Sequence, residues 1–312
     1  MRRIRLTAVV VILAIAFGSA LYLERVRISD WLAAQNAPDV PASVTYAEVS
    51  GEEEEPSADA EPESEEEDVE VVPEPGVGEE EEAEIDEEEV SVPAEPVEGS
   101  PEVAPSAPET SPTSSTDNDN IPIEFNLAVP FTSQAPFANW DEVHEETCEE
   151  ASLYMVYLYY QGEPEGQVDA STADTELLRI VDFENELFGF YKDTTAEQTA
   201  ILAEQMYGYT RTEILKNPTA EDIKRHVAAG RPVIVPAAGR MLRNPNFSGE
   251  GPIYHMFVIR GYTATSFIAN DPGTRRGENY VYDIDTIMSA IHDWNDGDVY
   301  NGAKVVLVVY PE

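Results

Sequence analysis

Thr147-Cys148-Glu149-Glu150-Ala151-Ser152 contains the one cysteine of the 312-residue chain. Thr147 and Glu150 match the S/T-x-x-E pattern of a capping box, which predicts a helix that begins with Cys148. Free backbone N–H groups and the positive end of the helix dipole stabilise a thiolate at this position. Cys148 is therefore a candidate nucleophile. The alternative is a structural cysteine, because free cysteines commonly pack in protein cores.

The negative charge of the chain is unevenly distributed. The formal net charge is −44, and residues 28–120 contain no Lys or Arg. Residues 1–120 hold 32 of the 62 acidic residues and 5 of the 18 basic residues, so residues 121–312 are acidic as well. Both parts would repel a phosphate backbone, so we expect no nucleic-acid partner.

The N-terminus has the features of a membrane segment. Three arginines within Met1–Arg5 precede an apolar run, Leu6–Leu23, which is long enough to cross a bilayer as a helix. We predict that residues 1–36 are an uncleaved membrane anchor and, from the positive-inside rule, that the remainder lies outside the cytoplasm. The small residues Gly18-Ser19-Ala20 support an alternative, in which a signal peptidase cleaves the segment and the protein is secreted.

Residues 37–120 consist largely of Glu, Pro, Ser, Val and Ala, with acidic runs such as Glu52–Glu55 and Glu79–Glu82. Such a sequence has too little apolar surface to offset the entropy of ordering the chain. We therefore predict a disordered acidic linker that tethers the C-terminal domain.

Residues 121–312 have an ordinary globular composition and enough length for one domain with a substantial core. Helical periodicity comes first and strand patterns follow, so we expect an α+β fold with a mostly antiparallel sheet. The expected helices span 148–160, 173–188, 195–207, 219–229 and 285–294. The expected strands span 125–131, 232–236, 254–262, 266–270, 279–282 and 304–310.

Partners for a nucleophilic Cys148 occur elsewhere in the domain. His255 begins one predicted strand and Asp271 follows the next, and a hairpin between the two strands would make these side chains neighbours. Asn270 is the competing partner of the histidine, since adjacent strand residues face opposite ways. Gln134, in the loop after the first strand, could complete an oxyanion hole with the Cys148 backbone N–H.

The other histidines are weaker candidates. His144, four residues before the cysteine, is a rival base or metal ligand, but one cysteine and scattered histidines offer no convincing zinc set. His226 and His292 lie on predicted helices, and we expect both to be surface or core residues.

Five ordered motifs resemble the papain-like cysteine peptidases of family thirty-nine, in particular stand-alone domains related to double-glycine leader peptidases. They are Val129–Gln134, the Cys-x-x-Ala-Ser helix start, Arg231–Val235, Tyr254–Tyr262 and Asn270–Thr274. The resemblance implies a papain-like fold with Cys148 as nucleophile, His255 as acid and base, Asp271 as orienter and Gln134 in the oxyanion hole. It implies no metal or organic cofactor. The Glu149-Glu150 pair departs from the Gly-Pro that commonly follows the family's cysteine.

These observations lead to the hypothesis of a membrane-tethered extracytoplasmic cysteine peptidase, or related amide hydrolase, that forms a thioester acyl-enzyme. We expect a monomer that acts on peptides or proteins, with cell-envelope peptides among the candidates. The alternative is a catalytically inactive papain-fold module that binds peptides or glycans. The residues do not distinguish hydrolysis from transfer to an amine.

Overall fold

The computed structural model describes residues 40–51 and 121–311. Within these ranges no helix has the length and apolar character needed to cross a membrane. The apolar run at residues 6–23, which carries the membrane-anchor prediction, lies outside the described residues.

The first half of the domain is helical, as predicted. It comprises α3 (Cys148–Tyr160), α4 (Ala170–Phe188), α5 (Ala196–Tyr207) and α6 (Ala220–Ala228). Capping boxes begin α5 at Thr195 and α6 at Thr219, and each Thr side chain accepts a backbone N–H from the third helical residue. Helix α3 is buried nearly all the way round, because it packs against α4 and α5 on one side and against the sheet on the other.

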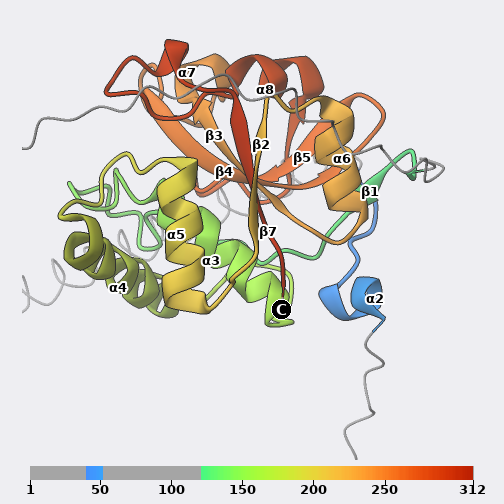
Figure 1. Cartoon of the computed structure of the whole chain (residues 1–312), viewed down its shortest axis with the longest axis horizontal. Helices are drawn as coiled ribbons and strands as arrows, with labels where there is room; N and C mark the ends of the chain where they lie inside the picture. The colour runs from blue at the N-terminus through green and yellow to red at the C-terminus, as the bar shows by residue number, and fades with distance from the viewer. Residues whose placement is uncertain (1–39, 52–120, 312) are drawn as a thin grey trace, which may run out of the picture. The chain divides into compact units, whose positions relative to one another are not determined.

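The sheet is antiparallel throughout, in the order β2-β7-β3-β4-β5-β6, and a short β1 pairs with the end of β4. The strands are β1 (Phe125–Asn126), β2 (Thr212–Lys216), β3 (Val233–Ala238), β4 (Tyr254–Tyr262), β5 (Ser266–Asn270), β6 (Tyr280–Asp283) and β7 (Val305–Val309). Figure 1 shows α3, α4 and α5 together beside these strands, with α7 (Gly239–Leu242) and α8 (Ile284–Ala290) at the opposite side.

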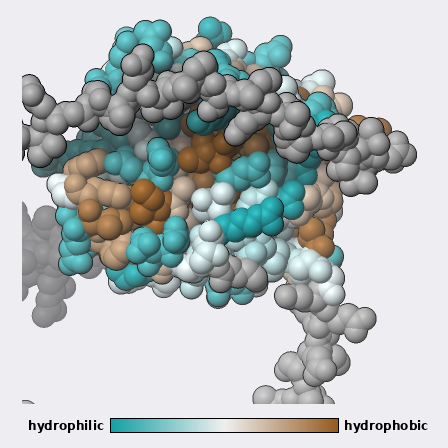
Figure 2. Space-filling model, in the orientation of Figure 1, coloured by the Kyte–Doolittle hydropathy of each residue, from teal (hydrophilic) through white to brown (hydrophobic). Residues whose placement is uncertain are grey.

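The core is centred on β3, β4 and β7, in which every residue is buried. Their sequences are almost continuously apolar, which is typical of strands covered on both faces. On the face of the molecule in Figure 2, hydrophobic residues gather in patches bordered by hydrophilic ones, one of them on the side formed by α4 and α5. The rigid core provides a fixed frame for the side chains at the ends of α3 and β4.

The predictions for β4 and β5 match the observed bounds. The strand predicted at residues 125–131 is observed only as the short β1. Beyond β1, Leu127 and Phe131 form isolated bridges with Val44 and Gln167. Strand β2 and helix α7 were not predicted.

Residues 40–51, which we call the strap, fold against the domain although they lie in the predicted disordered linker. The strap contains a one-turn helix, α2 (Tyr46–Ser50), that begins with a capping box at Thr45. The Tyr46 ring packs edge-on against Tyr159 and Tyr160 of α3, with ring centroids 5.7 Å and 5.2 Å away. The linker prediction is therefore wrong for these residues, because a few apolar side chains find a docking surface that composition does not reveal.

Backbone contacts fix the strap further. The Val44 N–H donates to the Asn126 carbonyl at 2.9 Å, and the Ala128 N–H donates to the Val44 carbonyl at 2.8 Å. Val49 approaches Gly230 so closely that a Cβ on this glycine would lie 2.4 Å from the valine Cγ1. Gly230 has φ +77°, so it both ends the α6 turn and leaves room for the strap.

Candidate active site

Helix α3 begins at Cys148 as predicted, but its N-terminus is held differently from the predicted capping box. Thr147 makes no side-chain cap hydrogen bond, and its hydroxyl donates instead to the Gln134 carbonyl at 3.0 Å. The helix start is thereby tied to the loop that carries Gln134. The sequence pattern was misleading here because a tertiary partner replaces the local one.

His255 and Asp271 are brought together by the hairpin of β4 and β5. The His255 Nε2 atom lies 2.8 Å from the Asp271 Oδ1 atom, and both side chains are fully buried. The predicted proximity of these two residues is confirmed. With Nε2 bound to the carboxylate, Nδ1 is the ring nitrogen left for proton transfer.

The Asp271 carboxylate accepts several further hydrogen bonds. The Gly273 N–H donates to Oδ1 at 3.0 Å, while the Tyr282 hydroxyl at 2.5 Å and the Asn244 amide at 3.1 Å donate to Oδ2. Burial alone would raise the pKa of Asp271, but His255 and these donors outweigh it and hold the pKa below its ordinary value. The carboxylate therefore stays ionised beside the imidazole.

Tyr282 and Asn244 were missed by the sequence analysis. Tyr282 lies on β6, and Asn244 follows Arg243, whose φ of +53° turns the chain after α7. Neither residue has a local sequence signal. The competing orienter, Asn270, is excluded by its contacts, since its amide donates to the carbonyls of Val129 and Pro130, both at 3.0 Å.

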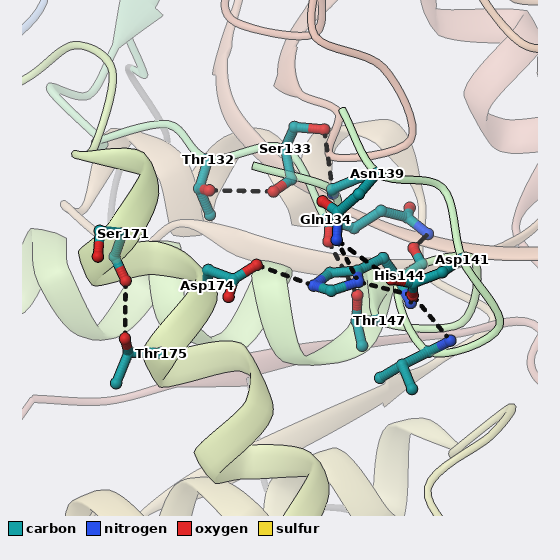
Figure 3. Close-up of polar contacts among 12 residues, drawn as sticks. Thr132, Ser133, Gln134, Asn139, Asp141, His144, Thr147, Ser171, Asp174 and Thr175 are labelled. Atoms are coloured by element: carbon teal, nitrogen blue, oxygen red, sulfur yellow. Dashed lines mark hydrogen bonds and ion pairs between the residues drawn. The ribbon is translucent and has the colours of Figure 1, made fainter. Parts of the chain in front are cut away.

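Gln134 is held in position by the segment that precedes α3 (Figure 3). Its side-chain amide donates to the His144 carbonyl at 2.8 Å, which uses one of the two amide hydrogens and leaves the other. The Gln134 side chain lines the same cleft as Cys148, so the free hydrogen can serve as an oxyanion donor.

The imidazole of His144 has a supporting role in this segment. Its Nδ1 lies 2.7 Å from the Asp141 carboxylate and its Nε2 lies 3.0 Å from that of Asp174, as Figure 3 shows. Both ring nitrogens are thus occupied, which removes His144 as a rival base. No group of three or more His, Cys, Asp and Glu side chains suited to a metal ion occurs in the described parts of the chain.

The Cys148 thiol is buried and hydrogen-bonded to its sequence neighbour. Its Sγ donates to the Glu149 Oε2 at 3.0 Å. Burial first, and then the Glu149 charge, raise the pKa of the thiol well above its ordinary value. No hydrogen bond joins Sγ to the His255 ring within the described residues, and the raised pKa favours the protonated thiol.

The second acidic residue after the cysteine is also buried. Glu150 and Glu184 of α4 are fully buried, and none of their four carboxyl oxygens has a hydrogen-bond partner among the described residues, so Glu150 does not make the reciprocal bond of the predicted capping box. Burial raises the pKa of Glu184 to about 8 and that of Glu150 well above its ordinary value. The pair is therefore protonated at neutral pH.

Cys148, His255 and Gln134 all line one cleft with a volume of about 1010 Å³. Its helical wall comes from the segment before α3, from α3 itself and from the loop before α5. Its sheet wall comes from the loops after α7 and β5 and from the start of β4. The cleft is large enough for several residues of a peptide. Its walls include the aromatic residues Trp140, Phe247, Tyr254 and Trp294.

The model of the Peptidase_C39-like family matches residues 126–298, which is more than half of the chain. A crystal structure from Bacillus anthracis, described as a C39-like peptidase, matches at 15% identity with a TM-score of 0.40, covering 61% of this chain and 98% of that one. No match was found among curated proteins.

Proposed function

The chain belongs to the Peptidase_C39-like family, and from this membership and the cleft geometry we propose that it is a cysteine peptidase with Cys148 as its nucleophile. The observation that carries the proposal is the His255–Asp271 hydrogen bond of 2.8 Å, beside a cleft that also holds the cysteine at a helix N-terminus. Such an arrangement supplies a nucleophile, a base and an orienter of the base.

In the proposed reaction, the thiol proton passes to His255 Nδ1 and the sulfur attacks the carbonyl carbon of the scissile amide. The C–N bond then breaks, the imidazolium protonates the leaving amine, and a thioester remains on Cys148. Water hydrolyses the thioester with His255 acting as base, which restores the thiol. Asp271, anionic and fixed by four donors, stabilises the imidazolium.

The tetrahedral intermediate needs donors for its oxyanion. The backbone N–H of Cys148 and the free side-chain hydrogen of Gln134 supply them in this proposal. Gln134→Ala should lower kcat/KM by roughly a hundredfold to a thousandfold, the usual cost of removing one such donor.

The resting thiol must leave Glu149 before it reacts. In this proposal, substrate binding favours a position of Sγ beside the imidazole over the position at the Glu149 carboxylate. The two positions of the thiol correspond to a resting and a reactive state.

A thiol-directed, mechanism-based probe tests the nucleophile. We expect it to label the wild-type chain, and labelling should fall to background for Cys148→Ala and strongly for His255→Ala. The buried mutations must leave the circular dichroism spectrum unchanged. Equal labelling of wild type and Cys148→Ala would overturn the proposal, since Cys148 is the one cysteine of the chain.

A second candidate function is a catalytically inactive module that binds peptides in the same cleft. The observation that favours it is the buried, protonated thiol held by Glu149 rather than His255. Binding of peptides by the wild-type chain without turnover and without probe labelling would support this alternative.

We also propose that residues 6–23 anchor the protein in the cell membrane with the peptidase domain outside the cytoplasm. The length and composition of this apolar run support the proposal. Membrane fractionation with alkaline carbonate extraction, together with protease protection of intact cells, tests both parts. Recovery of the whole chain in the soluble fraction would overturn it.

A further inference from the structure

The two walls of the cleft carry opposite charges near the reacting groups. The helical wall presents acidic side chains, and the sheet wall presents two consecutive arginines in the loop after β5. The acidic residues are Glu145, Glu146 and Asp193, and the basic ones are Arg275 and Arg276. Glu149 also lines the cleft, but burial raises its pKa well above the ordinary value. Because Cys148 belongs to the first wall and His255 to the second, a bound scissile bond lies between groups of opposite sign.

The acidic wall differs from an ordinary solvated surface. Glu149 is 1% exposed although it lines the cleft, and Asp193 is partly buried. Glu146 and Asp193 line the same cleft, and burial and then the Glu146 charge raise the pKa of Asp193 to about 6. The neighbouring Lys192 does not neutralise them, since it pairs with Glu142 at 3.3 Å and lowers the pKa of Asp193 only in part.

The basic wall is tied to the catalytic histidine. Arg275 and Arg276 are exposed and follow Asp271 in a loop that closes on itself, where the Asp271 N–H donates to the Gly277 carbonyl at 3.0 Å. The Arg276 N–H donates to the Thr274 hydroxyl at 3.2 Å. The loop therefore presents both arginines from a fixed backbone, and its Gly273 lies against the imidazole.

A cationic ligand group relieves the repulsion between clustered carboxylates, and paired guanidinium groups bind carboxylates well. Aromatic side chains between the walls, among them Trp140 and Trp294, can pack against the intervening peptide.

We propose that the substrate is a peptide with a cationic side chain that binds Glu146 and Asp193 and a carboxylate that binds Arg275 and Arg276, both within a few residues of the scissile bond. This inference rests on the proposed peptidase function and names the class of substrate. A zwitterionic peptide is favoured over neutral or uniformly charged peptides, because it alone satisfies both walls.

The inference can be tested with a fluorogenic peptide library and the full chain in detergent. The library varies the charge at each of three positions on either side of the scissile bond. We expect a Lys or Arg preference at one position and an Asp or Glu preference at another, each about five- to fiftyfold in kcat/KM over a neutral isostere. Both preferences should weaken as salt concentration rises.

Matched variants assign each preference to its wall. Asp193→Asn combined with Glu146→Gln should abolish the preference for a cationic residue. Asn is suitable at position 193 because it tolerates the left-handed φ of +54° there. Arg275→Glu with Arg276→Glu should reverse the acidic preference. Glu186→Gln removes an exposed charge of α4 that does not line the cleft, and it should change neither preference.

Each outcome has a distinct meaning. Cleavage without charge preference, or preferences unaffected by the wall variants, overturns this inference and leaves the peptidase function intact. Probe labelling of Cys148 with no peptide cleaved overturns the assignment of a peptide substrate. Absence of both labelling and cleavage overturns the proposed function itself and this inference with it.

Discussion

Replacing Glu184 with glutamine should make the stability of the domain less dependent on pH. In the folded state the Glu184 carboxyl is fully buried against Glu150, and its pKa is about 8 rather than 4.5. As the pH rises above 4.5, the unfolded chain releases this proton while the folded chain keeps it. The unfolded state then binds fewer protons, so the free energy of unfolding decreases as the pH rises.

The magnitude follows from the two pKa values. The free energy of unfolding decreases by up to about 1.4 kcal/mol for each pH unit, and by at most about 5 kcal/mol between pH 4.5 and pH 8. This loss is a large part of the roughly 5–15 kcal/mol that stabilises a typical domain. Glutamine has no proton to lose, and its amide can donate a hydrogen bond to the buried Glu150 carboxyl.

Urea unfolding at pH 5, 6, 7 and 8 measures the effect on a chain that begins at residue 37. We expect Glu184→Gln to be near wild-type stability at pH 5 and more stable by about 2–4 kcal/mol at pH 8. Glu186→Gln is the matched control, since it removes an exposed carboxylate from the same helix without touching the buried pair. The same pH slope in wild type and Glu184→Gln, or a loss of stability at pH 8, would refute the reasoning.

Three further changes test other parts of the structure. Asp271→Asn should reduce kcat/KM about a hundred- to ten-thousandfold at unchanged circular dichroism, because the neutral amide no longer stabilises the imidazolium; a near-wild-type rate would exclude Asp271 as orienter. Glu149→Gln should speed alkylation of Cys148 by iodoacetamide at pH 7, since it removes a charge that raises the pKa of the thiol; an unchanged rate would contradict this role. Tyr46→Ala should lower the free energy of unfolding by about 1–3 kcal/mol in urea titrations, because it removes the ring contacts of the strap with Tyr159 and Tyr160. Equal stability of wild type and Tyr46→Ala would show that the strap does not contribute.

The strap also changes how the acidic segment is understood. The strap ends at residue 51, and the next described segment begins at residue 121. A backbone hydrogen bond between Val44 and Asn126 joins the strap to β1. Residues 52–120 therefore connect two parts of one folded unit. The minimal domain for experiments is consequently residues 40–312 rather than the predicted 121–312.

Local and short-range patterns in the sequence were sufficient for much of this protein. Nearly continuous apolar runs located α3 and the strands β4 and β5, because elements that are covered on all sides need apolar residues along most of their length. The hairpin between β4 and β5 made His255 and Asp271 neighbours, since its two strands follow directly in the chain. The helix start at Cys148 came from the same local evidence.

Tertiary structure alone decided the features that depend on contacts distant in sequence. Glu150 pairs with Glu184 instead of capping its own helix, Asn244 and Tyr282 secure Asp271, and the strap returns to the domain across the acidic segment. The opening stretch, Thr147–Ser152, shows the limit most clearly. The sequence determined that its cysteine begins a helix beside two glutamates. Only the folded chain buries the thiol against Glu149, and this burial is the main cause of its raised pKa.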